Sequence, residues 1–106
     1  MDLDLQVSLG YVRSKLQERG RAHLSVRAQG RSLVIYSRER GEEAIRAVLT
    51  RLEGRPDYAL SIANHRGKWQ LVSVVGPLRE MMDMLTGELA FALAYWPDNG
   101  PHRDVR

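Results

Sequence analysis

Three histidines, His23, His65 and His102, are the side chains best suited to acid–base chemistry or metal binding at neutral pH. They are far apart in the chain and have no short-range ligand spacing. The chain contains no cysteine, which excludes a thiolate zinc site, a cysteine nucleophile and a disulfide framework. No glycine-rich segment matches a phosphate-binding loop. We therefore predict neither a metal nor another cofactor.

A polar segment at residues 64–68 is the strongest candidate for catalysis. It contains Asn64, and it places His65 beside Arg66 and close to Lys68. An imidazole can act as a general base while a neighbouring cation stabilises negative charge, as cleavage of a phosphodiester requires. No carboxylate stands at a recognisable spacing to orient the imidazole. The sequence therefore assigns no catalytic residue and favours a non-enzymatic protein, with a nuclease centred on His65 as a third hypothesis.

Arginine accounts for 14 of the 16 basic residues, and the formal net charge is +3. Residues 11–55 carry eleven basic and five acidic side chains, a net +6, whereas the rest of the chain carries −3. A cationic surface with an aromatic ring suits single-stranded nucleic acid, because phosphates bind the cations and bases stack on the ring. Nucleic-acid binding is thus the alternative function. If the polar sides of the first two predicted strands coincide, the residues involved are Arg27, Arg31, Tyr36 and Arg38.

The main hypothesis comes from the helix predicted to start after Gly76-Pro77 and to run to about Trp96. Methionines line its first half, and methionine-rich faces adapt to variable partners. Residues 89–96 are apolar on every side, whereas a two-layer domain covers only one side of a helix. We expect a protein partner, or a second copy in a homodimer, to cover this surface; two flanking helices would be the alternative cover. The predicted interface residues are Met81, Met84, Leu85, Phe91, Tyr95 and Trp96.

The elements that position these residues follow from the hydrophobic pattern. Alternation of apolar and polar side chains, interrupted by glycine-containing breaks, predicts two β-hairpins. Their strands are expected at 22–28, 32–38, 58–63 and 68–75. Residues 42–53 instead place apolar side chains at helical spacing, with Arg46 off the apolar face, and Gly54 and Pro56 would end that helix.

These elements form two rounds of hairpin and helix that resemble each other in sequence. Leu24-Ser25-Val26 matches Leu60-Ser61-Ile62, and a glycine precedes each predicted helix. The matches indicate an internal ββα duplication, although any two hairpin–helix units share glycine turns and apolar alternation.

The N-terminus allows two interpretations. Leu5, Leu9, Val12 and Leu16 lie on one helical stripe, and Gly20 could end that helix. Residues 2–9 also alternate strictly, as a strand would. We favour the helix.

The fold expected is α+β in two layers. A mainly antiparallel sheet of four strands, or five if residues 2–9 form one, carries helices on one face in the order α-ββ-α-ββ-α. Residues 1–96 form one domain and residues 97–106 a flexible tail. No apolar stretch is long enough to span a membrane, and the acidic N-terminus is unlike a secretory signal. We expect a cytoplasmic protein that binds a protein partner and no membrane.

Overall fold

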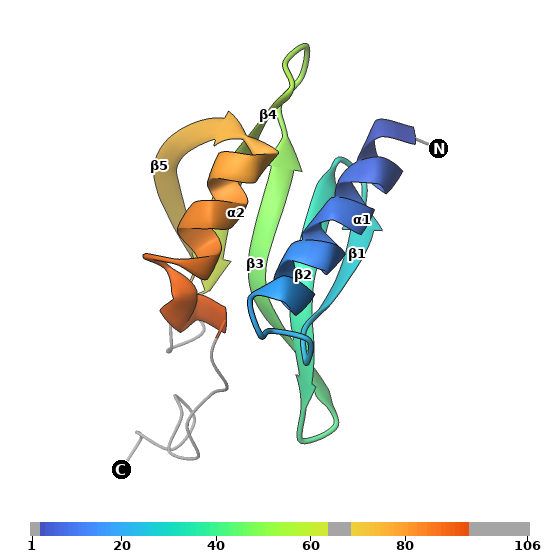
Figure 1. The fold of residues 1–106 in the computed structure, drawn as a ribbon, viewed down its shortest axis with the longest axis vertical. Helices are drawn as coiled ribbons and strands as arrows, with labels where there is room; N and C mark the ends of the chain where they lie inside the picture. Colours follow the sequence, from blue (N-terminus) through green and yellow to red (C-terminus); the bar gives the residue numbers. More distant parts are fainter. Residues whose placement is uncertain (1–2, 64–68, 94–106) are drawn as a thin grey trace.

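An antiparallel meander of five strands forms one layer of the protein, and two α-helices cover one of its faces (Figure 1). The computed structural model describes residues 3–63 and 69–93, without the side chains of residues 3, 4, 69, 70, 73, 74 and 91. The α+β class and the antiparallel sheet are confirmed. The elements are α1 (Leu3–Glu18), β1 (Ser25–Gln29), β2 (Ser32–Glu39), β3 (Glu42–Arg51), β4 (Asp57–Ala63), β5 (Trp69–Pro77), α2 (Leu78–Thr86) and the 3₁₀ turn η1 (Ala90–Leu93).

The N-terminal segment is a helix, as favoured from its stripe of apolar residues. Leu5, Val12 and Leu16 are buried in the core, and Leu9 packs against it. Gly20 has a φ of +75°, and the amide of Arg21 donates to the carbonyl of Leu16 at 2.7 Å. These features close α1 in a Schellman motif. The strand alternative for residues 2–9 is therefore wrong from residue 3 onward.

The prediction of a helix at residues 42–53 is wrong, because β3 occupies most of that segment. Ile35 pairs with Ala47 and Tyr36 pairs with Ile45, which leaves Arg46 as an extra residue in β3. This β-bulge interrupts the alternation between the two faces of the strand. Apolar residues on either side of the bulge therefore fall at spacings that imitate a helix.

A tight turn joins β2 to β3, at the glycine-containing break that was expected to precede a helix. Glu39 pairs with Glu42, so the loop consists of Arg40 and Gly41, whose φ angles are +57° and +79°. Two positive φ angles define a type I′ turn, which matches the twist of the flanking strands. Because β3 replaces the expected helix, the order is α-βββββ-α, and the first unit of the proposed ββα duplication lacks its helix.

The bulged residue Arg46 is buried rather than exposed. Its side chain is 2 % exposed, forms an ion pair with Glu39 and donates a hydrogen bond to Ser37 at 3.3 Å. Burial lowers the pKa of Arg46 to about 10, so its guanidinium is still charged at neutral pH. The β-bulge between β2 and β3 therefore encloses a charged side chain.

The last helix is shorter than expected. The prediction that it continues to Trp96 is wrong, because α2 ends at Thr86. The amides of Gly87 and Leu89 both donate to the carbonyl of Met84, at 3.3 and 2.9 Å, and turn the chain away from the helix axis. Residues Ala92 and Leu93 of η1 then return to the core. Within residues 3–63 and 69–93, no helix has the length and apolarity needed to cross a membrane.

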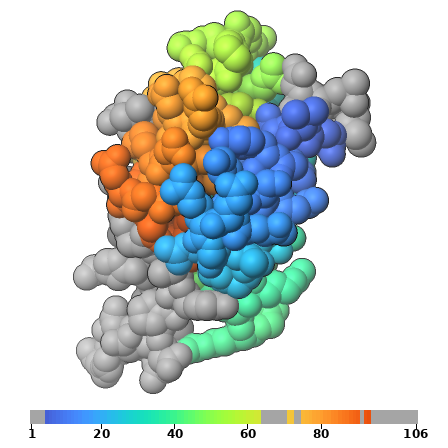
Figure 2. Space-filling view, viewed as in Figure 1, coloured from blue at the N-terminus to red at the C-terminus, as the bar shows by residue number. Residues whose placement is uncertain are grey.

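The core lies between the sheet and the helices. Helix α1 packs against β1 and β2, α2 packs against β4 and β5, and η1 reaches β3. Figure 2 shows α1 and α2 side by side over this face, with the β2–β3 hairpin projecting beyond them. The largest fully buried apolar side chains are Val12, Leu16, Leu33, Ile35, Leu49, Leu60, Ile62, Met81, Met82, Leu85 and Leu93.

Candidate interaction surfaces

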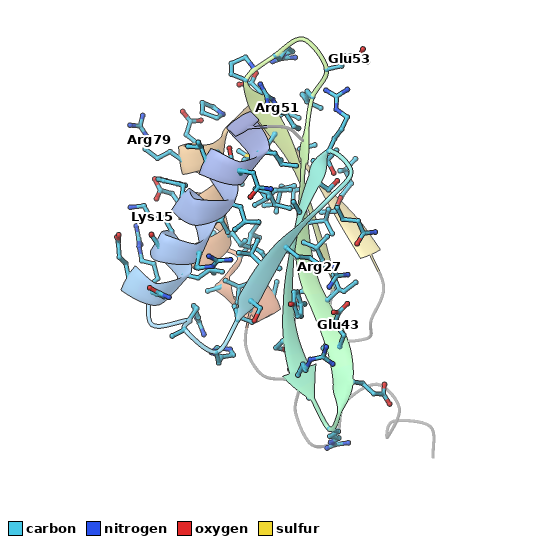
Figure 3. All side chains as sticks on the ribbon, turned by 90° about the vertical axis from the view of Figure 1, so that its right-hand side faces the viewer. Lys15, Arg27, Glu43, Arg51, Glu53 and Arg79 are labelled. Carbon is cyan, nitrogen blue, oxygen red and sulfur yellow. The ribbon has the colours of Figure 1, made fainter. Side chains whose placement is uncertain are left out.

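The side of the sheet opposite the helices is not covered by any other described element (Figure 3). Residues that pair across neighbouring strands point to the same face, so the registers identify the side chains on it. We call this surface the open face. From β1 to β5 it carries Ser25 and Arg27, then Val34 and Tyr36, then Ile45 and Val48, then Ala59 and Ser61, and finally Leu71 and Val75.

The open face carries a charged pair on β1 and β3. Arg27 donates a hydrogen bond of 2.5 Å to Glu43, and its guanidinium carbon lies 4.9 Å from the centre of the Tyr36 ring. The hydrogen bond to Glu43 raises the pKa of Arg27. Gln29 also accepts from this guanidinium at 3.3 Å. Arg27 therefore already has an anionic partner, and its side chain occupies a face of the aromatic ring.

The other end of the open face is apolar and exposed. Leu71 is 68 % exposed and Val75 is 43 % exposed, both on β5 at the edge of the sheet. Their register partners on β4 are Ser61 and Ala59, and Val48 of β3 pairs with Ser61. We call these five uncharged residues the β5 patch. An antiparallel sheet with one solvated face normally presents polar side chains there, so this surface is unusual for a face exposed to water.

The residues predicted to contact a partner lie elsewhere. Met81 and Leu85 are completely buried, and Met84 is partly buried against the core. Because these methionine and leucine side chains are enclosed by the chain's own sheet and helices, Met81 and Leu85 are not available to a partner. The side chain of Phe91 and residues Tyr95 and Trp96 lie outside the described residues.

The residues predicted to contact nucleic acid are divided between two places. Arg27 and Tyr36 share the open face, and Arg38 lies on the same side of β2 as Tyr36. Arg31 is in the β1–β2 turn at the opposite end of β2. The proposed catalytic segment at 64–68 lies outside the described residues. Among the residues that the structure does describe, no group of three His, Asp or Glu could hold a metal ion.

Arg31 borders a hollow of about 370 Å³ that sequence reasoning missed. The hollow lies between the β1–β2 turn and the β3–β4 connection. A hydrogen bond from the amide of Arg51 to the carbonyl of Arg31, at 3.0 Å, holds these two segments together. We call it the arginine pocket. No local motif could have revealed it, since only the pairing of β2 with β3 brings its residues together. It is lined by Arg31, Arg51, Leu52, Gly54, Arg55 and Pro56.

Two carboxylates form ion pairs with arginines that line the arginine pocket. Arg55 forms an ion pair of 2.5 Å with Asp57, and Arg31 lies 3.9 Å from Glu53. Glu53 is 92 % exposed, so solvent screens its pairing with Arg31 strongly. Both carboxylates therefore already form an ion pair with an arginine that lines the hollow.

Comparison of the chain with protein-family models, with curated proteins and with solved structures found no match.

Proposed function

We propose that the protein is a partner-binding domain that forms a homodimer through the β5 patch. The observation that carries this proposal is the exposure of Leu71 and Val75 on a sheet face where polar residues are expected. Contiguous apolar surface of this kind marks interaction sites in soluble proteins. The proposal keeps the function predicted from the sequence but moves the contact from the C-terminal helix to the sheet.

Charge favours a second copy as the occupant. In a twofold-symmetric contact, side chains near the axis face their own counterparts, so charged residues there repel each other. The β5 patch contains no charged side chain, and β5 itself has none between Trp69 and Pro77. The Arg27–Glu43 pair joins β1 to β3 on the same face, so it lies toward the β1 edge and away from β5. Two copies can therefore bring their patches together without burying an unpaired charge.

Light scattering on a sizing column, over a range of micromolar concentrations, tests this proposal. We expect the wild type to elute as a dimer and the variant Leu71→Glu/Val75→Glu as a folded monomer, since the added carboxylates would face each other across the axis. The milder Leu71→Ser should weaken the dimer without placing a charge in a strand. Circular dichroism and cooperative unfolding would show that each variant keeps its fold.

Val7 provides a matched control. It is 74 % exposed on α1, a helix that covers the face of the sheet opposite the open face. Val7→Glu should leave the dimer intact. A wild type that is monomeric throughout the range would contradict the proposal, as would a dimer that tolerates both β5 variants.

Nucleic-acid binding is the second proposed function, supported by the common face of Arg27, Tyr36 and Arg38. The pairing of Arg27 with Glu43 reduces the positive charge available there. If this function holds, single-stranded oligonucleotides should bind with an affinity that falls steeply as salt rises, and Tyr36→Leu should weaken that binding. Absence of binding at low salt would exclude it.

A further inference from the structure

We propose that two copies of the chain pair their β5 strands edge to edge, antiparallel to each other, so that the dimer contains one continuous sheet. This inference rests on the proposed dimer and specifies how the two β5 patches meet. Strand β5 is last in the sheet order, and no strand among the described residues pairs with its outer side. Such an edge exposes backbone amides and carbonyls that a further strand can bind.

The two edges of the sheet differ in their protection against such pairing. Proteins protect an edge with a short strand, a charged side chain or a proline. Strand β1 has five residues and carries Arg27. Strand β5 has nine residues and no charged side chain, and its proline, Pro77, is its last residue. The edge at β5 is therefore the one that favours a second strand.

A bulge determines which part of β5 can reach a second copy. From Leu71 to Val75, β5 advances four residues while its partner β4 advances only two, from 61 to 59. A strand with extra residues bends, and Figure 1 shows β5 curving outward at the margin of the sheet. Because the number of extra residues is even, Leu71 and Val75 stay on the same face. The segment 71–75 is therefore the part of the edge that meets a partner strand first.

Twofold symmetry defines the register of this contact. When two identical antiparallel strands pair symmetrically, positions equally far from the axis lie opposite each other. Pairing centred on Ser73, the middle of the segment 71–75, places Leu71 of each copy opposite Val75 of the other. Residues opposite each other on one face are in contact, and these two are 68 % and 43 % exposed in the single chain. A second copy therefore covers both exposed side chains at once.

The size of the β5 patch also favours an edge contact. A stable interface involves about 20–30 residues on each side, whereas the β5 patch has only five. In a continuous sheet the twofold axis is perpendicular to the sheet, so the helices of both copies lie on one side of it. Helix α2 packs against β4 and β5. The two α2 helices therefore flank the axis and enlarge the contact beyond the strands and patches.

The carboxylate of Glu80 lies close to β5 without opposing this arrangement. A Cβ added to Gly76 would come within 3.2 Å of Glu80 Oε1. Pairing centred on Ser73 places the Gly76 positions of the two copies on opposite sides of the axis, three residues from it on each strand. At about 3.3 Å per residue they are about 20 Å apart along the strands, which is about two Debye lengths at physiological salt. Repulsion between the two Glu80 side chains is therefore screened.

Single cysteines test the pairing, because the wild type contains none. Ser73→Cys places two thiols opposite each other at the axis, within reach of a disulfide. With oxidised glutathione we expect the monomer band on a non-reducing gel to be lost to a covalent dimer. The matched control is Ser61→Cys, on β4 within the β5 patch. In a continuous sheet its two thiols are three strand spacings, about 14 Å, apart, so the monomer band should remain.

A mixture of two further variants tests the register without relying on Ser73→Cys. Leu71→Cys and Val75→Cys oxidised together should form a mixed covalent dimer, because these positions lie opposite each other in the proposed pairing. Each variant oxidised alone should remain monomeric on the gel, since its own two thiols are about 13 Å apart along the strands. Equal cross-linking in the mixture and in the separate variants would overturn this register.

The outcomes separate this inference from the proposed dimer. Light scattering that finds only monomers contradicts both. A dimer that cross-links through Ser61→Cys and not through Ser73→Cys has its open faces packed together, which overturns edge pairing and leaves the β5 patch as the interface. Cross-linking at both positions, or at neither, also overturns edge pairing. A wild-type dimer that cross-links through Ser73→Cys alone supports it.

Discussion

Arg46, the bulged residue of β3, forms a buried ion pair with Glu39 at the end of β2. The side chain of Arg46 is 2 % exposed and that of Glu39 is 15 % exposed. The bulge directs Arg46 to the same side of the sheet as Ser37, whose hydroxyl accepts from the guanidinium and donates to Glu39. The three side chains thus form one hydrogen-bonded network, in which each polar group helps to offset the cost of burying the others.

Removing the carboxylate of Glu39 should destabilise the protein more than removing both members of the pair. Glu39→Gln removes the carboxylate of Glu39 from the buried Arg46 charge, and we expect a loss of about 2–3 kcal/mol in the free energy of unfolding. Glu39→Gln/Arg46→Met replaces the pair with uncharged groups and should recover a large part of that loss. Urea denaturation measures both, with Glu18→Gln at the exposed Lys15–Glu18 pair as a control expected to cost less than about 0.5 kcal/mol. A double variant as unstable as Glu39→Gln would show that the buried charge of Arg46 is not the cause of the loss.

Two glycines, one inside α1 and one just after its end, should respond to alanine in opposite directions. Gly10 lies inside the helix, and an added Cβ would meet no atom within 4 Å, so Gly10→Ala should stabilise the protein by about 0.5–1 kcal/mol. Gly20 also has open space, but its φ of +75° is costly for alanine, and Gly20→Ala should destabilise by about 1 kcal/mol. Thermal unfolding of the two variants measures these shifts. If both substitutions move the melting temperature the same way, the difference in backbone conformation is not what governs them.

The type I′ turn predicts that asparagine is better than arginine at position 40. Arg40 has a φ of +57°, a conformation that asparagine tolerates more readily. Arg40→Asn should raise the free energy of unfolding by about 0.5–1 kcal/mol, as measured by urea denaturation. Arg40→Ala removes the same charge but keeps a side chain that disfavours positive φ, and it should give no such gain. An equal gain in both variants would indicate that the charge of Arg40, rather than its backbone, limits stability.

The sequence was sufficient for α1 and for the β1–β2 hairpin because their signals are local. The stripe from Leu5 to Leu16 and the alternation around Val26 each lie within one element. The helix expected at 42–53 failed because a single bulged residue, Arg46, shifted the phase of β3. A local pattern does not contain that information, since a bulge is defined by the partner strand.

Prediction of the candidate sites from the sequence depended still more on how distant strands pair. The sequence placed Arg27 and Tyr36 on a common face only if the two strands had the correct register, and the pairing of Ser25 with Tyr36 supplies it. It could not associate Arg31 with Arg51, which are brought together by β2 and β3. Nor could it distinguish methionines that serve a partner from those that fill the core, because both follow the same helical spacing.

Tyr58 and Ser8 connect the sheet to α1, and their contact predicts a coupled effect on stability. The hydroxyl of Tyr58 donates to Ser8 Oγ at 2.9 Å, while the ring of Tyr58 is buried in the core. Tyr58→Phe keeps the ring and removes the donor, so we expect a loss of about 1 kcal/mol in the free energy of unfolding. Ser8→Ala should cost a similar amount because it leaves the phenol hydroxyl without this acceptor. The double variant should lose less than the two single losses added together, since both remove one hydrogen bond. Urea denaturation of the four proteins gives the coupling, and strictly additive losses would mean that the hydroxyls contribute to stability independently.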